Sequence, residues 1–188
     1  MTVKTDISRF QIHDELTAPD ASARLLQGMS VAGGAVSKFV GVLAGSPAAL
    51  RAFARMRHEL RDGALPRPTR ERIALAVAEE RGDPYSVSQH AGTARAAGLG
   101  LDEITRARGW ASSDPREAAL LAFLKSLFEE GGRPATHLLE EAREVDWSDE
   151  QLLEAVAHVA LNEFQSLMAN AAALPQDQAD PAVLPAAA

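Results

Sequence analysis

Four polar residues in the middle of the sequence stand at a spacing that could support proton-transfer chemistry. Glu71 is followed after eleven residues by Asp83, and Ser86 and His90 come within the next seven. A carboxylate beside an imidazole is a common acid–base pair, because each favours the charged form of the other. Ser86 and His90 lie four residues apart, so on a helix they share a face. Glu71 would have to approach them from a second, roughly antiparallel helix.

Each of these residues also has a structural interpretation. Asp83 precedes Pro84, a pair typical of the N-cap and first turn of a helix, and Ser86 is a common polar residue in such a turn. A Ser86–His90–Glu71 hydrolase triad can be written, but no nucleophile elbow surrounds the serine. For Glu71 and His90, two alternatives stay open: an acid–base or ligand-binding role, and a buried structural hydrogen bond.

The segment around these residues resembles the alkylhydroperoxidase D-like and carboxymuconolactone decarboxylase superfamily. That superfamily carries a glutamate, eleven residues, a Cys-x-x-Cys motif, three residues and a histidine; Glu71, Asp83, Ser86 and His90 stand at that spacing. The flanks SPAALRAFARMRHELRDGALPRPTRERIALAV and HAGTARAAGLGLDEI, and the later EAVAHVALNEFQSLMANAA, look like the superfamily as well. The resemblance covers residues 31–172, and it implies an alkylhydroperoxidase D-like helical fold.

Asp83 and Ser86 occupy the positions of the two redox cysteines, and the sequence contains no cysteine at all. The peroxidase activity that the resemblance implies is thiol chemistry, in which a thiolate attacks a peroxide and a second cysteine resolves the sulfenic acid as a disulfide. Neither aspartate nor serine can be oxidised and reduced in this way. We therefore expect a cysteine-less member that has lost peroxiredoxin-type oxidoreductase activity, although Glu71 and His90 match the proton-handling positions of the superfamily.

Two other functions remain open. One is a cofactor-free decarboxylase or related acid–base enzyme acting on a small carboxylic acid, with His90 as the general acid. Tyr85 would line the substrate site, and Arg72, Arg67 or Arg95 would hold the carboxylate. The other is a non-catalytic binding or scaffold protein that has kept only the fold. The resemblance also implies a homo-oligomer, either a trimer or a hexamer.

The sequence predicts neither a metal site nor a cofactor. Its five histidines show no HxxxH or HExxH spacing, and the missing cysteines exclude thiolate ligands. His158 lies beside Val159 and Leu161 on the apolar side of the last expected helix. We interpret it as a core histidine rather than a ligand.

The charge balance argues against several classes of partner. Nineteen Lys and Arg residues against 26 Asp and Glu residues give a net charge of -7, the opposite of the basic surface that nucleic acids require. The first twenty residues contain no apolar run of signal-peptide length. Six glycines and prolines interrupt the apolar stretch 25–50, which favours two short buried helices over a membrane span. We expect a cytoplasmic protein that binds neither nucleic acid nor a membrane.

Helix signals punctuate the chain, and no stretch shows the period-two alternation of a β-strand. N-cap and first-turn pairs, together with one capping box, mark four helix starts at Ser46–Pro47, Asp83–Pro84, Asp114–Pro115 and Ser148 with Gln151. Thr69 is expected to cap the helix that carries Glu71. The sequence therefore predicts an all-α fold of about eight helices without a sheet.

The same signals divide the chain into three parts. We expect an extended N-terminal segment over residues 1–20 and one helical domain over residues 21–174. Residues 175–188 alternate proline, alanine and acidic side chains without a helical period, which predicts a flexible tail.

Overall fold

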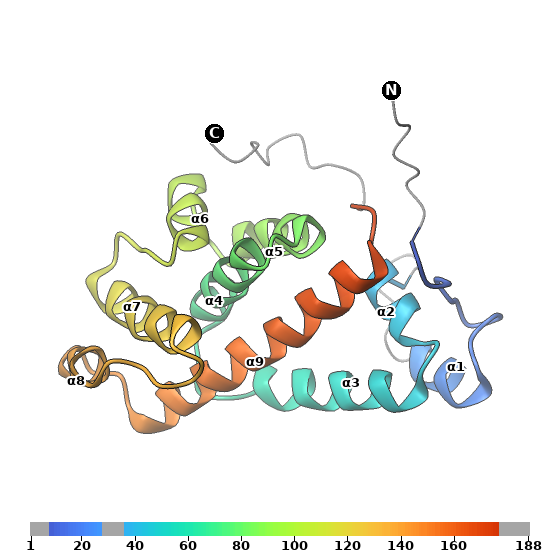
Figure 1. Cartoon of the computed structure of the whole chain (residues 1–188), viewed down its shortest axis with the longest axis horizontal. Coiled ribbons are helices and arrows are strands. Elements are labelled where there is room, and N and C mark those ends of the chain that lie inside the picture. Colours follow the sequence, from blue (N-terminus) through green and yellow to red (C-terminus); the bar gives the residue numbers. More distant parts are fainter. Residues whose placement is uncertain (1–7, 28–35, 177–188) are drawn as a thin grey trace.

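The computed structural model describes residues 8–27 and 36–176, and these residues form nine α-helices and no strand (Figure 1). This confirms the all-α prediction. Residues 1–7 of the expected N-terminal segment and 177–188 of the expected tail lie outside the described residues. The helices are α1 (Asp20–Leu26), α2 (Lys38–Leu43), α3 (Pro47–Arg61), α4 (Arg67–Glu80), α5 (Pro84–Ala96), α6 (Leu101–Arg108), α7 (Pro115–Glu129), α8 (Thr136–Glu144) and α9 (Asp149–Ala172).

The predicted start signals act as helix caps, with one exception. The side chains of Ser46, Asp83, Asp114 and Ser148 each accept a hydrogen bond from a backbone N–H in the first turn of the next helix. Thr69 does not cap α4, because that helix already begins at Arg67, after Pro66. The Thr69 side chain is instead buried, and its hydroxyl donates to Glu117 Oε1 on α7 at 2.6 Å.

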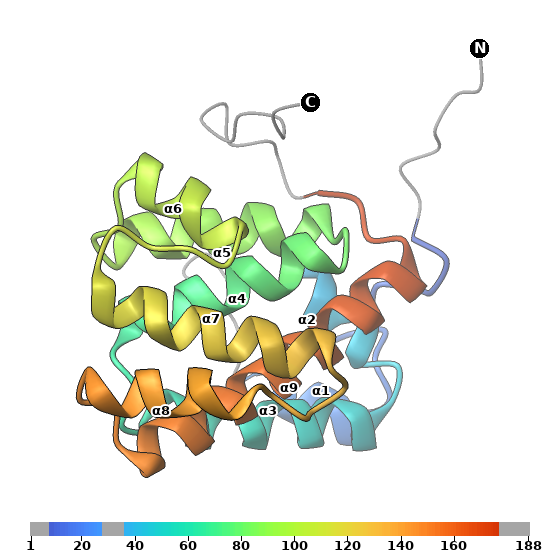
Figure 2. The ribbon, with the colours of Figure 1, turned by 60° about the vertical axis from the view of Figure 1, so that its left-hand side comes forward.

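Helix α9 is the element around which the others assemble. It crosses the molecule with α3 along one side and α4 and α5 on another (Figure 1), and it also contacts α2 and α7. Helix α4 packs against both α5 and α6, and α8 lies against α7 (Figure 2). Because α4 contacts α5, α6 and α9, side chains that leave it in different directions meet different helices.

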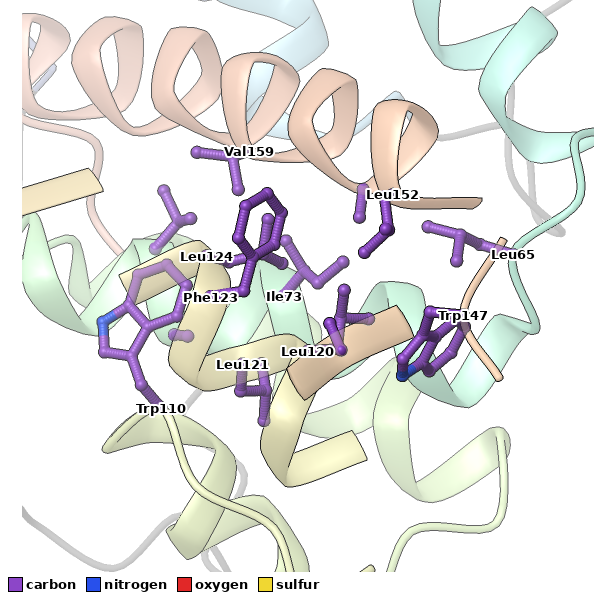
Figure 3. Packing of buried hydrophobic residues seen from close by; sticks show 14 residues of the cluster. Leu65, Ile73, Trp110, Leu120, Leu121, Phe123, Leu124, Trp147, Leu152 and Val159 are labelled. Atoms are coloured by element: carbon purple, nitrogen blue, oxygen red, sulfur yellow. The ribbon is translucent and has the colours of Figure 1, made fainter. Parts of the chain in front are cut away.

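Two apolar clusters flank this arrangement. The larger one joins α4, α7, α8 and α9 through buried residues that include Ile73, Leu120, Leu124 and Val159, with Trp110 and Trp147 at its two sides (Figure 3). The second cluster, formed mainly by α2, α3 and α9, contains an edge-to-face pair of Phe39 and Phe53 with ring centroids 5.0 Å apart. Burial of these side chains supplies the main driving force for packing the helices.

The described part of the N-terminal segment lies against α2 and the end of α9. The Arg9 N–H donates to the Ala172 carbonyl at 2.7 Å, and the His13 N–H donates to the Gly41 carbonyl at 3.0 Å. A Cβ at Gly41 would approach Ile12 Cγ2 to 2.7 Å, so this close contact requires glycine. No helix in the described ranges is long and apolar enough to span a membrane.

Candidate functional site

A tight turn folds α5 back along α4 and brings the predicted polar residues together. Gly82 adopts a φ of 57°, a conformation that favours glycine, and Asp83 follows as the N-cap of α5. Asp83 Oδ1 accepts the Ser86 N–H at 3.1 Å, so the cap that the Asp83–Pro84 pair predicted is formed. The turn places the start of α5 beside α4, as the contact between Glu71 and His90 requires.

Glu71 and His90 meet across these two helices. His90 Nδ1 lies 3.0 Å from Glu71 Oε2, and the Thr93 hydroxyl donates to the same oxygen at 2.6 Å. Burial raises the pKa of Glu71, but the hydrogen bonds from His90 and Thr93 and the positive charges of His90 and Arg67 outweigh it, so the net pKa is below the ordinary value. The side chains of His90 and Glu71 are 20% and 15% exposed, so the pair is sheltered and still reaches the surface.

The other side of the imidazole faces an amide on α9. Gln165 Nε2 lies 3.3 Å from His90 Nε2 and donates to Ser86 Oγ at 3.2 Å. A carboxamide nitrogen only donates, so His90 Nε2 must accept, and the ring proton resides on Nδ1, where it points to Glu71. Three helices therefore contribute to one chain of contacts that runs from Glu71 through His90 and Gln165 to Ser86.

Asp83 and Ser86 lie at the buried end of this chain. Each is 1% exposed. Within the described residues, no hydrogen bond joins Ser86 directly to His90, since the Gln165 amide stands between them. The direct serine–imidazole contact that a hydrolase triad needs is therefore absent from this arrangement. Asp83 Oδ2 is buried and has no hydrogen-bond partner among the described residues.

Tyr85 and Arg72, the two residues predicted to bind substrate, are placed elsewhere. Tyr85 is 2% exposed and belongs to the apolar cluster of α2, α3 and α9; its hydroxyl oxygen accepts the Phe39 N–H at 3.3 Å. Arg72 forms ion pairs with Glu103 at 2.8 Å and Glu117 at 3.5 Å. The structure therefore does not bring Arg72 to the Glu71–His90 pair.

The other two arginines considered for a substrate carboxylate are exposed. Arg67 lies in the first turn of α4, one turn before Glu71, and its charge contributes to the lowered pKa of that carboxyl. Arg95 lies in the last turn of α5. Arg67 is therefore a candidate whose positive charge favours the ionised form of Glu71.

His158 is buried in the core, at 6% exposure, next to Glu154. Its Nε2 lies 3.8 Å from Glu154 Oε1 and forms no hydrogen bond, and burial lowers the pKa of the ring. The Glu154 carboxylate accepts the backbone N–H groups of Ala64 and Leu65 at 2.6 and 3.0 Å. No cluster of three histidine or acidic side chains within the described ranges could hold a metal ion.

Sequence reasoning missed two members of the site, Thr93 and Gln165. Thr93 follows His90 by three residues, so helical periodicity alone placed it on the same face. Gln165 is 75 residues away from His90 in the chain, and only the packing of α9 against α5 brings the two together. It lies within the EAVAHVALNEFQSLMANAA stretch that carries part of the resemblance, which is the one signal that pointed to it.

Solved structures with the same fold include peroxidase-related proteins. An alkylhydroperoxidase AhpD core protein from Ralstonia eutropha, an uncharacterized peroxidase-related protein, is 23% identical with a TM-score of 0.80, covering 92% of this chain and 93% of that chain. An uncharacterized peroxidase-related protein from Silicibacter is 18% identical with a TM-score of 0.78, covering 95% and 96%. At these identities the likeness shows the fold alone.

The debrominase Bmp8 also shares the fold. Its apo structure is 18% identical with a TM-score of 0.72, and the match covers 94% of this chain and 95% of that one. A cysteine-to-alanine variant of Bmp8, in complex with 2,3,4-tribromopyrrole, matches with a TM-score of 0.70. No protein of curated function matches the sequence.

The sequence itself matches a family over the region that contains the site. Residues 47–128 match the Carboxymuconolactone decarboxylase family, and this range includes Glu71, Asp83, Ser86 and His90. The chain therefore combines a match to the Carboxymuconolactone decarboxylase family over residues 47–128 with the fold of the alkylhydroperoxidase D-like proteins, and it contains no cysteine.

Proposed function

We propose that the chain is a thiol-independent acid–base enzyme acting on a small organic molecule, with His90 as the proton-transferring group. The observation that carries this proposal is the 3.0 Å contact between His90 Nδ1 and Glu71 Oε2 in a site that is sheltered but not closed. A carboxylate behind an imidazole fixes its tautomer and stabilises the imidazolium that forms when the ring takes up a proton.

The roles of the site residues follow from their contacts. Glu71, held by Thr93 and with a lowered pKa, remains a carboxylate at neutral pH and orients the ring. His90 Nε2 is the atom left to accept a proton from the substrate and to return it. Gln165 and Ser86 supply neutral polar groups beside that atom. Each step needs only proton movement between the substrate and the imidazole.

Thiol peroxidase activity has no chemical basis in this chain, because it has no cysteine. The peroxidase-related proteins and the debrominase support a small-molecule enzyme only at the level of a shared fold. The tribromopyrrole held by the Bmp8 variant further supports a small organic substrate for a site on this fold.

A cofactor-free decarboxylase acting on a small carboxylic acid is the second candidate. The observation that favours it is Arg67, an exposed cation whose charge acts on Glu71 at the site. Arg72, already paired with Glu103 and Glu117, would have to leave that cluster before it could bind a substrate. In this alternative His90 protonates the carbanion left after the loss of carbon dioxide.

Proton exchange is the experiment that tests the acid–base proposal. A panel of ketones, lactones and unsaturated lactone acids is incubated in D₂O, and exchange at carbon and release of carbon dioxide are followed by NMR. We expect turnover that His90→Gln lowers about 10²–10⁴-fold, with a smaller loss for Glu71→Gln. His137→Gln, at an exposed histidine of α8, is the matched control and should leave turnover unchanged.

Two results would contradict the proposal. One is turnover of an alkyl hydroperoxide with a dithiol reductant above a denatured-protein blank, which would require chemistry that this chain lacks. The other is the absence of His90-dependent proton transfer across the whole panel, which would favour the non-catalytic binding or scaffold function.

We also propose that the protein is a homo-oligomer, a trimer or a hexamer, as the resemblance implies. Large apolar side chains that remain exposed in the described monomer support this: Leu153 and Leu167 on α9 are 72% and 68% exposed. Oligomers bury such side chains at their interfaces. Light scattering should give a multiple of the monomer mass, and a monomeric mass at micromolar concentration would refute assembly.

A further inference from the structure

The side chain of Gln165 occupies the point where two functional groups of the site converge. Its Nε2 atom lies 3.2 Å from Ser86 Oγ and 3.3 Å from His90 Nε2. A primary amide nitrogen has two protons, so one N–H can point to each acceptor. The atom that faces His90 Nε2, the atom proposed to exchange protons with the substrate, is therefore a neutral N–H donor that belongs to the protein itself.

The surroundings of this point are rich in acceptors. Ser86 Oγ and His90 Nε2 already accept, and Asp83 Oδ2, in the same helical turn as Ser86, is buried without a hydrogen-bond partner. Glu71 from α4 contacts the ring and Asp83 accepts the Ser86 N–H at the start of α5, while α9 contributes the neutral Gln165. Arg67 acts on Glu71 from the exposed first turn of α4. The negative charges of Asp83 and Glu71 would repel a ligand anion at this point, whereas a neutral donor could use the two acceptors that Gln165 now occupies.

The Gln165 contacts are of a kind that a ligand can replace. Both distances are at the long end of the hydrogen-bond range, and the Gln165 amide that makes them carries no charge. Gln165 is only half-buried, and its side chain is long and flexible, so it can turn towards solvent while α9 stays in place. Catalysis at His90 Nε2 requires such a movement, because the amide otherwise covers the lone pair.

We propose that Gln165 is a displaceable internal mimic of the substrate, and that the substrate presents a neutral N–H donor, such as a carboxamide, to Ser86 and His90. This inference rests on the proposed acid–base function and narrows its substrate class. In the resting protein the Gln165 amide holds the place of that donor and keeps both acceptors satisfied. On binding, the substrate N–H takes the same place, and the amide turns away.

A small-molecule replacement experiment tests this. Gln165→Ala removes a fragment that corresponds to acetamide, and the NMR signals of the His90 ring report what enters the space. The probes are acetamide, N,N-dimethylacetamide, which has the carbonyl without N–H, and acetate, which has similar size and a negative charge. Gln165→Asn, whose amide is too short to reach, serves as the second variant. Asn170→Ala removes another α9 amide, one that donates to the Arg81 carbonyl at 2.9 Å, and is the matched control.

We expect acetamide to shift the His90 ring signals saturably in both Gln165 variants, and the other two probes to leave them unchanged. In the wild type and in Asn170→Ala the response should be weaker by about tenfold or more, because the tethered amide competes at high effective concentration. Equal binding of dimethylacetamide, preferential binding of acetate, or no binding by folded Gln165 variants would each overturn the proposal. Proton exchange that still depends on His90 would then show that only the substrate class is wrong.

Discussion

Two neighbouring residues of α4, Glu71 and Arg72, enter two very different polar clusters. Glu71 turns to α5 and joins His90, Thr93 and Gln165, in a cluster that still reaches the surface. Arg72 turns to α6 and α7 and pairs with Glu103 and Glu117. Both clusters are built around glutamate carboxylates, and they differ in how many of their polar atoms already form ion pairs or strong hydrogen bonds.

The Arg72 cluster is arranged as a structural unit. Burial raises the pKa of Glu103, but Ser112, Ser113 and Arg72 donate to its carboxylate and lower the pKa to about 2. Burial raises the pKa of Glu117 above its ordinary value, although Thr69 and Arg72 partly offset this. Several donors therefore hold Glu103 as a permanent charge, which stabilises the junction between the helices and prevents this carboxylate from exchanging protons near neutral pH.

The Glu71 cluster contains a titratable ring nitrogen, His90 Nε2, that no carboxylate among the described residues contacts. Its imidazole bonds to a carboxylate on one side and to a neutral amide on the other, so a proton can arrive at Nε2 without breaking an ion pair. A cluster of charged residues becomes a candidate site when one of its titratable atoms is held only by weak, exchangeable contacts.

The largest expected effect is on the structural cluster. Arg72→Ala would leave the part-buried carboxylate of Glu103 and the buried carboxylate of Glu117 without their shared cation, and we expect the free energy of unfolding to fall by about 3–5 kcal/mol. Urea unfolding measures this loss. Arg67→Ala, at an exposed arginine of the same helix, should cost less than about 0.5 kcal/mol. Equal losses for the two variants would show that the Arg72 pairs add nothing to stability.

Acid should weaken the same cluster. The pKa of Glu103 is about 2 in the folded protein and 4.5 in its ordinary state, so this carboxylate contributes its full stabilisation above pH 4.5. The contribution is lost as the pH falls from 4.5 through 2, and it amounts to about 3 kcal/mol. Free energies of unfolding measured across this range should decline less steeply for Glu103→Gln than for the wild type. Parallel curves would mean that Glu103 is an ordinary surface carboxyl.

The sequence predicted local structure better than it predicted side-chain partners. The Asp83 N-cap and the Ser148 capping box depend on residues within one turn, and both formed as expected. Thr69 failed as a cap because Pro66 and Pro68 already favour an earlier helix start, and because its partner Glu117 lies 48 residues further on. A threonine before a helical stretch looks the same in either role.

The site was predictable in part for the same reason. Glu71, Asp83, Ser86 and His90 share one helix hairpin, and their spacing carries the superfamily motif. The direction in which Arg72 points depends on the positions of α6 and α7, and the role of Gln165 depends on the packing of α9 against α5. Periodicity along one helix does not encode either arrangement.

A smaller effect is expected at the candidate site. His90→Gln removes the imidazole, whose hydrogen bond and positive charge lower the pKa of Glu71. Burial, which raises that pKa, then becomes the dominant influence on it. We expect the pKa of Glu71 to rise, because burial then acts with less opposition. Carboxyl ¹³C titration measures it. Thr93→Val, which removes one neutral donor, should raise the pKa of Glu71 less. An unchanged pKa in both variants would mean that neither His90 nor Thr93 influences this carboxyl group.

Introducing two cysteines at positions 83 and 86 should have a small effect on stability, and it tests the thiol chemistry that this chain lacks. The double variant Asp83→Cys with Ser86→Cys restores the Cys-x-x-Cys spacing on the N-terminus of α5, with Glu71 and His90 still in place. Losing the Asp83 cap should cost about 1 kcal/mol of stability, and Ser86→Cys is nearly isosteric.

The double variant also tests the chemistry of the site. If the helix terminus and the Glu71–His90 pair are intact, the thiol at position 86 should have a pKa below about 8.5 and should form a disulfide with position 83 after peroxide treatment. Thiol titration and mass spectrometry give both readouts, with the single Ser86→Cys variant as the control that cannot form this bond. A folded double variant whose thiols have ordinary pKa values and never form a disulfide would mean that the Glu71–His90 pair no longer acts on this position. The binding or scaffold function would then be favoured over an enzyme.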